Sequence, residues 1–236
     1  MTAVRSGMVF GLLWAVTVAA GAGCGGKEPM PAADGGLKTG DLLPLKEGNK
    51  WTYRVTDSKG TVTMKTQTVM AQETVGGTGP NKAVMAFKLI TQKHEGMSSV
   101  DETDSWQAKV GDTVVRYREL SYHATTGLLE QEEYWDPPKL RVDQSAARVV
   151  ESASWLEVYL ETKSPVGGVA STAEQHDLWT VVYPSQSVTV PAGTFNALVL
   201  QKVAGTVKNY WFVPGVGKVK ETGDQSEELA SFQVTP

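Results

Sequence analysis

The chain has 236 residues, with 22 lysines and arginines against 26 aspartates and glutamates, so its formal net charge is −4. A chain of this length can bury a hydrophobic core without crosslinks, and its single cysteine excludes a disulfide within the chain. The acidic balance and the lack of a basic patch in the sequence argue against nucleic acid as a partner.

The first 24 residues are organised like an export signal. Arg5 precedes an apolar stretch at residues 8–20, small residues follow at 21–23, and Cys24 comes next. The apolar stretch has the length of a secretory signal core and is short for a membrane-spanning helix. The segment resembles a bacterial lipoprotein signal peptide, in which the cysteine becomes the lipidated first residue of the mature protein. Gly21 departs from that pattern, which usually has leucine there. The resemblance implies a lipid anchor at Cys24.

Two alternatives to the lipid anchor stay open. An ordinary secretory signal could be cut near Gly23 or Gly26, and the apolar stretch could be a permanent membrane anchor. Gly25 stands where an aspartate would resemble a signal for retention in the inner membrane, so we expect the outer membrane. Removing residues 1–23 leaves 213 residues with 21 basic and 26 acidic side chains, a net charge of −5.

Residues 24–41 are expected to form a flexible tether. Five glycines and two prolines fall within residues 25–40, where large apolar residues are rare. Such a composition favours an extended or disordered chain. The predicted organisation is therefore a signal peptide at 1–23, a tether at 24–41 and a folded domain at 42–236.

The folded domain has the pattern of short β-strands. Residues 51–55 alternate large apolar and polar side chains, as in a strand with one buried face. Residues 106–110 and 114–120 flank a Gly-Asp turn, which is typical of a hairpin. The Asp136-Pro137-Pro138 sequence is expected to end a strand or to place it at a sheet edge. The predicted strands are 51–55, 62–66, 83–91, 106–110, 114–120, 130–135, 156–162, 179–183, 187–190, 197–203, 207–213, 217–221 and 226–234.

These strands predict a mainly β fold, either a single large curved antiparallel sheet or an open half-barrel. At most one short helix is expected, after a signal helix and the disordered tether. The candidate helix covers residues 143–156, where apolar side chains at 146, 149, 150 and 153 suit an amphipathic helix. Two strands joined by a turn would fit the same residues equally well.

Three motifs bracket the predicted domain. Residues 43–53 read LPLKEGNKWTY, residues 190–197 read VPAGTFNA, and residues 210–220 read YWFVPGVGKVK. Together they resemble uncharacterised bacterial envelope proteins of the DUF3108 and TapB-like families, which implies a curved antiparallel sheet and no settled activity. Read physically, residues 191–194 and 214–217 are turns, and Gly193 can take a positive φ angle. The aromatic residues of these motifs suit a sheet core or its rim, or a platform for a ligand.

Signals for catalysis or metal binding are weak. His94, His123 and His176 are far apart in the sequence, and no Gly-x-Ser-x-Gly motif occurs. The sequence around Gly217-Lys218 lacks the first glycine and the hydroxyl residue of a phosphate-binding loop. The acidic groups at 101–104 and 130–136 lack the spacing of an EF-hand and suit a solvated sheet face better than a calcium site. We therefore expect no enzyme activity, no cofactor and no metal.

Two functions fit these observations. The first is a lipid-anchored envelope protein that binds an envelope protein or has a structural role. The second is a carrier or sensor that holds an apolar ligand, such as a lipid, on a concave sheet. An open cavity lined by large aromatic residues would favour the carrier, whereas a filled concave face would favour the binding module. The candidate ligand-facing aromatics are Trp51, Tyr53, Trp106 and Trp211, together with Phe87 and Trp179.

Overall fold

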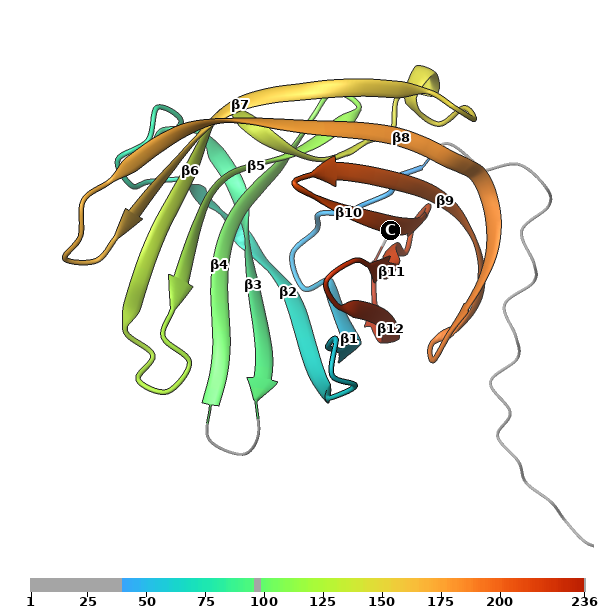
Figure 1. Cartoon of the computed structure of the whole chain (residues 1–236), viewed down its shortest axis with the longest axis horizontal. Coiled ribbons are helices and arrows are strands. Elements are labelled where there is room, and N and C mark those ends of the chain that lie inside the picture. Colours follow the sequence, from blue (N-terminus) through green and yellow to red (C-terminus); the bar gives the residue numbers. More distant parts are fainter. Residues whose placement is uncertain (1–39, 96–98, 236) are drawn as a thin grey trace, which may run out of the picture. The chain divides into compact units, whose positions relative to one another are not determined.

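The structure, a computed structural model, describes residues 40–95 and 99–235. Its regular elements are twelve β-strands and one three-residue 3-10 helix, η1 (Ala146–Arg148) (Figure 1). The strands are β1 (Lys50–Thr56), β2 (Val62–Thr74), β3 (Met85–Glu95), β4 (Ser99–Val110), β5 (Thr113–Tyr122), β6 (Leu129–Asp143), β7 (Ser154–Pro165), β8 (Ser171–Val190), β9 (Gly193–Ala204), β10 (Thr206–Val213), β11 (Gly217–Thr222) and β12 (Ser226–Gln233).

The strands form a closed antiparallel barrel. Each strand pairs with its neighbours in the sequence, and β1 pairs with β12 to close the ring. The closing register runs from Lys50 opposite Gln233 to Thr56 opposite Ser226. The mainly β prediction is confirmed, and the expectation of an open sheet or half-barrel is wrong. It was wrong because β1 uses both of its edges, one with β2 and the other with β12.

Two local expectations are also corrected. Pro137 and Pro138 lie inside β6 and do not end it, because the ladder to β5 is interrupted there, between the pairs Arg118–Tyr134 and Arg116–Lys139. Beyond Asp136 no pairing of β6 with β7 is found. The missing N–H groups of the prolines therefore remove no ladder hydrogen bond. Residues 143–156 contain only η1 before β7 begins, so a longer helix does not form.

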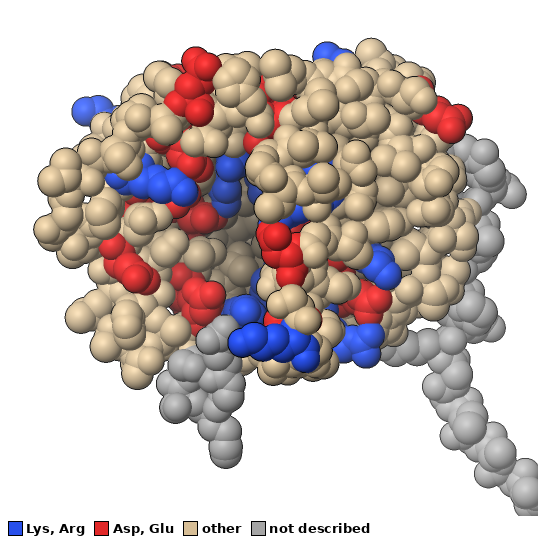
Figure 2. Space-filling view, viewed as in Figure 1, with Lys and Arg blue, Asp and Glu red and all other residues tan. Residues whose placement is uncertain are grey.

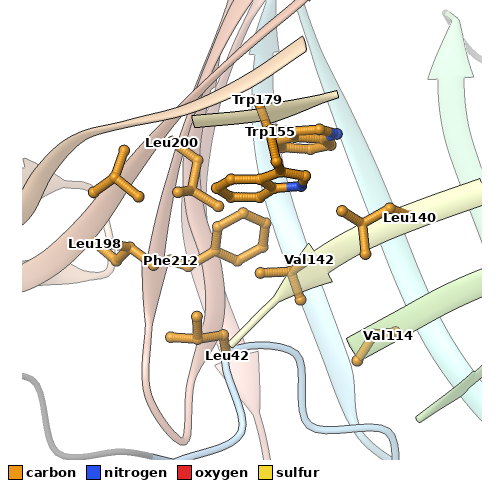
Figure 3. Packing of buried hydrophobic residues seen from close by; sticks show 10 residues of the cluster. Leu42, Val114, Leu140, Val142, Trp155, Trp179, Leu198, Leu200 and Phe212 are labelled. Carbon is orange, nitrogen blue, oxygen red and sulfur yellow. The ribbon is translucent and has the colours of Figure 1, made fainter. Parts of the chain in front are cut away.

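The hydrophobic core fills part of the barrel interior. One cluster contains residues from each of the strands β5 through β10. Figure 3 shows two of them, Trp155 and Trp179, stacked above Phe212. A second cluster joins β1, β2 and β3 to β8, β9, β11 and β12, and a third lies around Trp106. Leu42 precedes β1 yet is only 3% exposed within the first cluster, and Leu43 and Leu45 pack beside it. The segment before β1 thus helps to fill the barrel.

The inward-facing rows change from apolar to charged along several strands. On β8 the alternate residues Val181, Trp179 and Asp177 are all buried, and the row changes from apolar to charged at Asp177, toward the start of the strand. On β9 the buried Leu200 is followed by Lys202, and on β10 Phe212 and Tyr210 lead to Lys208. Because alternate residues of a strand share a face, these rows run from the core directly into a polar interior.

The predictions for the N-terminal region, including the signal peptide, Cys24 and most of the tether, lie outside the described residues. Within the part of the chain that the structure describes, no helix is long and apolar enough to cross a membrane.

Candidate functional site

The candidate site is a cavity of about 530 Å³ inside the barrel, open to solvent. Figure 2 shows the hollow, with blue and red side chains deep within it. Its size lies in the range of small-molecule sites in proteins. The residues that line it are Lys65, Gln67, Arg116, Lys139, Arg141, Tyr159, Glu161, Lys163, Gln175, Asp177, Lys202, Ala204, Thr206, Lys208, Tyr210, Lys218, Glu221, Asp224, Gln225 and Glu227.

The cavity carries an excess of positive charge. Eight of the lining residues are lysine or arginine and five are aspartate or glutamate, which gives a formal surplus of +3. The whole chain has a formal net charge of −4. The sign of the interior is therefore opposite to that of the molecule, so its potential favours anions over the average surface.

A buried ion cluster forms the wall on β2, β11 and β12. Glu227 is 3% exposed and accepts hydrogen bonds from Lys218 Nζ at 2.8 Å and from Lys65 Nζ. The two lysines hold the pKa of Glu227 well below its usual range, against the effect of burial. Glu221 and Glu227 raise the pKa of Lys218, whereas burial lowers the pKa of Lys65 to about 8, with Lys218 adding to the shift.

A second group of cations gathers on β5, β6 and β9. Lys202 lies 3.3 Å from Asp177, Lys139 lies 3.7 Å from Glu161, and Arg116 pairs with Glu119. Burial, with a contribution from Arg116, lowers the pKa of Lys139 to about 8 and lowers that of Lys202. The positive charge of Arg116 thus disfavours the protonated form of both lysines.

Arg141 differs from the other lining cations. Among residues 40–95 and 99–235, no carboxylate is found within ion-pair distance of it, and its buried Nε has no hydrogen-bond partner. It enters the interior at an irregularity of the β5–β6 ladder: Val114 pairs with Val142 and Val115 with Leu140, which leaves Arg141 as the extra residue. By strict alternation Arg141 would lie on the face opposite to Leu140 and Val142. The bulge changes the direction of its side chain.

Aromatic rings support several of these cations. The guanidinium of Arg116 lies 4.2 Å from the ring centre of Trp135, and Lys139 Nζ lies 5.1 Å from that of Tyr159. Lys202 Nζ is 5.6 Å from the ring centre of Trp179. Contacts of this kind hold a cation by the negative face of the ring without using up its hydrogen-bond donors.

The four aromatics predicted to face a ligand are in other places. Trp51 and Tyr53 are each 1% exposed; Trp51 Nε1 donates to the Val216 carbonyl at 2.6 Å, and the Tyr53 hydroxyl donates to the Lys218 carbonyl at 3.0 Å. The first and last motifs of the domain therefore meet in space, and these two bonds join β1 to the turn before β11 and to β11 itself. Neither residue is among those that line the cavity.

Trp106 and Trp211 are likewise hydrogen-bonded to side chains of other strands. Trp106 is buried and donates from Nε1 to Glu73 at 2.9 Å, and the partly buried Trp211 donates from Nε1 to Gln186 at 2.9 Å. Neither lines the large cavity. Of the wider set, Trp179 borders only a second space of about 20 Å³, which shares Gln67, Arg141, Lys202, Tyr210 and Lys218 with the large cavity.

The histidines and acidic groups weighed as metal ligands lie in separate places. His94 is on β3, His123 begins the loop after β5, and His176 on β8 contacts Glu174 at 2.8 Å. Glu132 binds Arg118, and Glu133 lies 3.5 Å from Lys163. Among the described residues, no group of three or more histidine, cysteine or acidic side chains is placed to hold a metal ion.

Sequence reasoning missed the cationic interior. One signal was available: Lys202 and Lys208 continue the inward rows of Leu200 and Tyr210, so alternation alone places them inside. Arg141 carried no such signal, because its direction depends on a bulge that is visible only once β5 and β6 are paired.

Comparisons with known proteins gave one distant structural similarity. No protein-family model and no curated protein sequence matches the chain. The chain is similar to a Bacteroides fragilis protein whose crystal structure has a YmcC-like fold, with 13% sequence identity and a TM-score of 0.48 over 81% of this chain and 98% of that one. A similarity at this level carries no argument about function. The resemblance to the DUF3108 and TapB-like families stays a prediction.

Proposed function

We propose that this chain is a non-enzymatic binding protein of the cell envelope, anchored to the outer membrane by a lipid at Cys24, and that it holds a small polar ligand inside its barrel. The observation that carries the proposal is the open cavity of about 530 Å³ at the charged end of the inward-facing rows. A core packed throughout would have closed this space, as apolar side chains do elsewhere in the barrel.

The lining favours a polar ligand over an apolar one. Of the residues that line the cavity, Ala204 is the only aliphatic one, and Tyr159 and Tyr210 are the aromatic ones. The space bordered by Leu43, Leu140 and Phe212 has a volume of about 20 Å³, which is too small for a lipid chain. A lipid inside this barrel would have to desolvate lysines and carboxylates without pairing them, at a high cost in free energy.

Mass spectrometry of the native protein tests the anchor. The untagged protein, extracted from membranes, is expected to begin at Cys24 and to carry a diacylglyceryl mass. A Cys24→Ala variant should leave the membrane fraction, because a lipid chain supplies the binding energy of such an anchor. A chain cut at another residue without an acyl mass, or a variant that stays with membranes as firmly as the wild type, would contradict the anchor.

Thermal unfolding of the purified mature protein tests the ligand class. Ligands that bind the folded state raise the unfolding temperature according to their affinity and concentration. A panel of polar metabolites should include compounds that raise it, whereas palmitate and phospholipid should leave it unchanged. If palmitate stabilises the protein and no polar compound does, the apolar-carrier function is correct and the proposal is wrong.

A further inference from the structure

Arg141 lines the cavity and, among the described residues, has no carboxylate partner, as expected of a residue that binds an anion. Arg141 borders both the large cavity and the small space of about 20 Å³. The acidic groups whose charge acts on it, Glu119 and Glu221, are already bonded to Arg116 and Lys218. A half-buried cation whose Nε is buried without a hydrogen-bond partner normally costs stability, so its presence calls for a compensating role.

The groups around Arg141 share its sign. Burial, and then the charge of Arg116, lower the pKa of Arg141, and Arg141 in turn lowers the pKa of Lys202. Arg116 is also incompletely satisfied, since its buried Nε has no hydrogen-bond partner in the described structure. Two guanidinium groups with donors left over, and two lysines beside them, leave a space in which negative charge would be stabilised from several sides.

Resting on the proposed use of the interior as a ligand site, we propose that the ligand is a small oxyanion with at least two negative charges, bound by Arg141 and surrounded by Arg116, Lys139 and Lys202. The lining residues carry a formal surplus of +3, which falls to +1 when Glu119 and Glu133, the partners of Arg116 and Lys163, are included, and it has the sign that attracts such an anion. A guanidinium presents its donors in a plane that fits the paired oxygens of a phosphate or a carboxylate. The cavity is large enough for a compact organic body attached to that group.

Other features of the molecule support this choice of centre. Asp177 accepts from Lys202 Nζ at 3.3 Å and from the Tyr159 hydroxyl at 3.2 Å, so it holds one wall in place without neutralising Arg141. The rings of Trp135 and Trp179 contact Arg116 and Lys202, so these two cations are held in the wall by contacts that use none of their hydrogen-bond donors. An anion would therefore meet a preformed set of donors, which lowers the entropy lost on binding.

Isothermal titration of the mature full-length protein at low salt tests the inference. The probes are pyrophosphate and citrate, with sucrose as an uncharged control. At least one anion should bind, sucrose should not, and the affinity should fall as salt is added. Stronger binding of pyrophosphate would identify a phosphate-bearing ligand, and stronger binding of citrate a polycarboxylate.

A matched pair of variants separates the site from the overall charge. Arg141→Gln should weaken anion binding by about tenfold or more, as expected when a charged hydrogen-bonding group is removed. Arg54→Gln removes the same charge from the outer face of β1, where the side chain is 49% exposed and bonded to Glu228, and should change the affinity by less than about twofold. Without anion, Arg141→Gln should unfold at a higher temperature than the wild type, because a cation with a buried, unsatisfied Nε is gone.

The outcomes distinguish this inference from the proposed function. Equal losses in the two variants, or an Arg141→Gln protein that is less stable without anion yet binds normally, would overturn the role of Arg141. Binding of neutral compounds alone would overturn the oxyanion and leave the polar-ligand proposal intact. If no polar compound of either kind binds, both proposals are wrong.

Discussion

Replacement of Glu227 by glutamine should destabilise the barrel strongly. The carboxylate is the partner of Lys65 and one of the two partners of Lys218, and its side chain is 4% exposed. Glutamine keeps the shape and removes the charge, so two buried ammonium groups lose their compensation. Breaking a buried ion pair from one side typically costs about 3–5 kcal/mol.

The pKa of Lys65 limits that cost. In the intact protein it is lowered to about 8, which is one unit above neutral pH. Once Glu227 is neutral, Lys65 can release its proton, so its share of the loss is at most about 1.4 kcal/mol at pH 7. Lys218 keeps Glu221 as a partner. We therefore expect the lower end of the range, a loss of about 3 kcal/mol in the free energy of unfolding.

Urea unfolding followed by tryptophan fluorescence measures this loss, with Glu228→Gln as the control. Glu228 is the next residue of β12, where it pairs with Arg54, 49% exposed, and with Lys220. Its replacement should cost less than about 1 kcal/mol. Adding Lys65→Met to Glu227→Gln should recover part of the loss, since it removes the cost of leaving Lys65 without its carboxylate partner, whether as a cation or as a neutral amine. Equal losses for the two glutamates would refute the assignment of the stability to the interior cluster.

Two further predictions concern the closing turn and pH. Gly217→Ala should cost about 1–3 kcal/mol of stability in a thermal unfolding assay, because φ is 108° there and the new Cβ would meet Trp51 Nε1 at 3.0 Å. Gly215→Ala is the control: its new Cβ would meet no atom within 4 Å, so it should cost less in the same assay. The free energy of unfolding from urea titrations should rise from pH 7 to 9, by about 1 kcal/mol per lysine. Lys65 and Lys139 have pKa values of about 8, so they release protons in the folded state at a lower pH than in the unfolded state. A Lys139→Met variant should show a flatter profile, and a falling wild-type profile would contradict the reasoning.

The strands could be predicted from the sequence because their information is local. Alternation at residues 51–55 and the turns at 191–194 and 214–217 each occupy a few adjacent residues, and β1 and the reversals before β9 and β11 are where these patterns place them. Gly193 has a φ of 139°, as a turn of this kind requires. Proline misled the prediction, since its effect depends on whether the neighbouring ladder needs that N–H, which a single strand does not reveal.

Closure and the cavity depend on contacts between distant residues. The sheet closes because β1 (Lys50–Thr56) pairs with β12 (Ser226–Gln233). That pairing depends on the register of all the strands between them. Trp51 and Tyr53 were placed among ligand-facing residues by their chemistry, yet their polar tips are used by the backbone of Val216 and Lys218. Arg141 owes its direction to one unmatched residue between two strands. None of these features has a signature within a single segment.

The pairing of the first strand with the last has a consequence for the order of folding. Until residues 226–233 have been synthesised, β1 and β11 each lack a neighbour, so the ring cannot close around a partial chain. Contacts this far apart in sequence form slowly, and an unclosed sheet keeps exposed edges. If the chain is exported, as the proposed function requires, its barrel would therefore remain unclosed until the last residues are synthesised. An unclosed chain is compatible with translocation in the unfolded state.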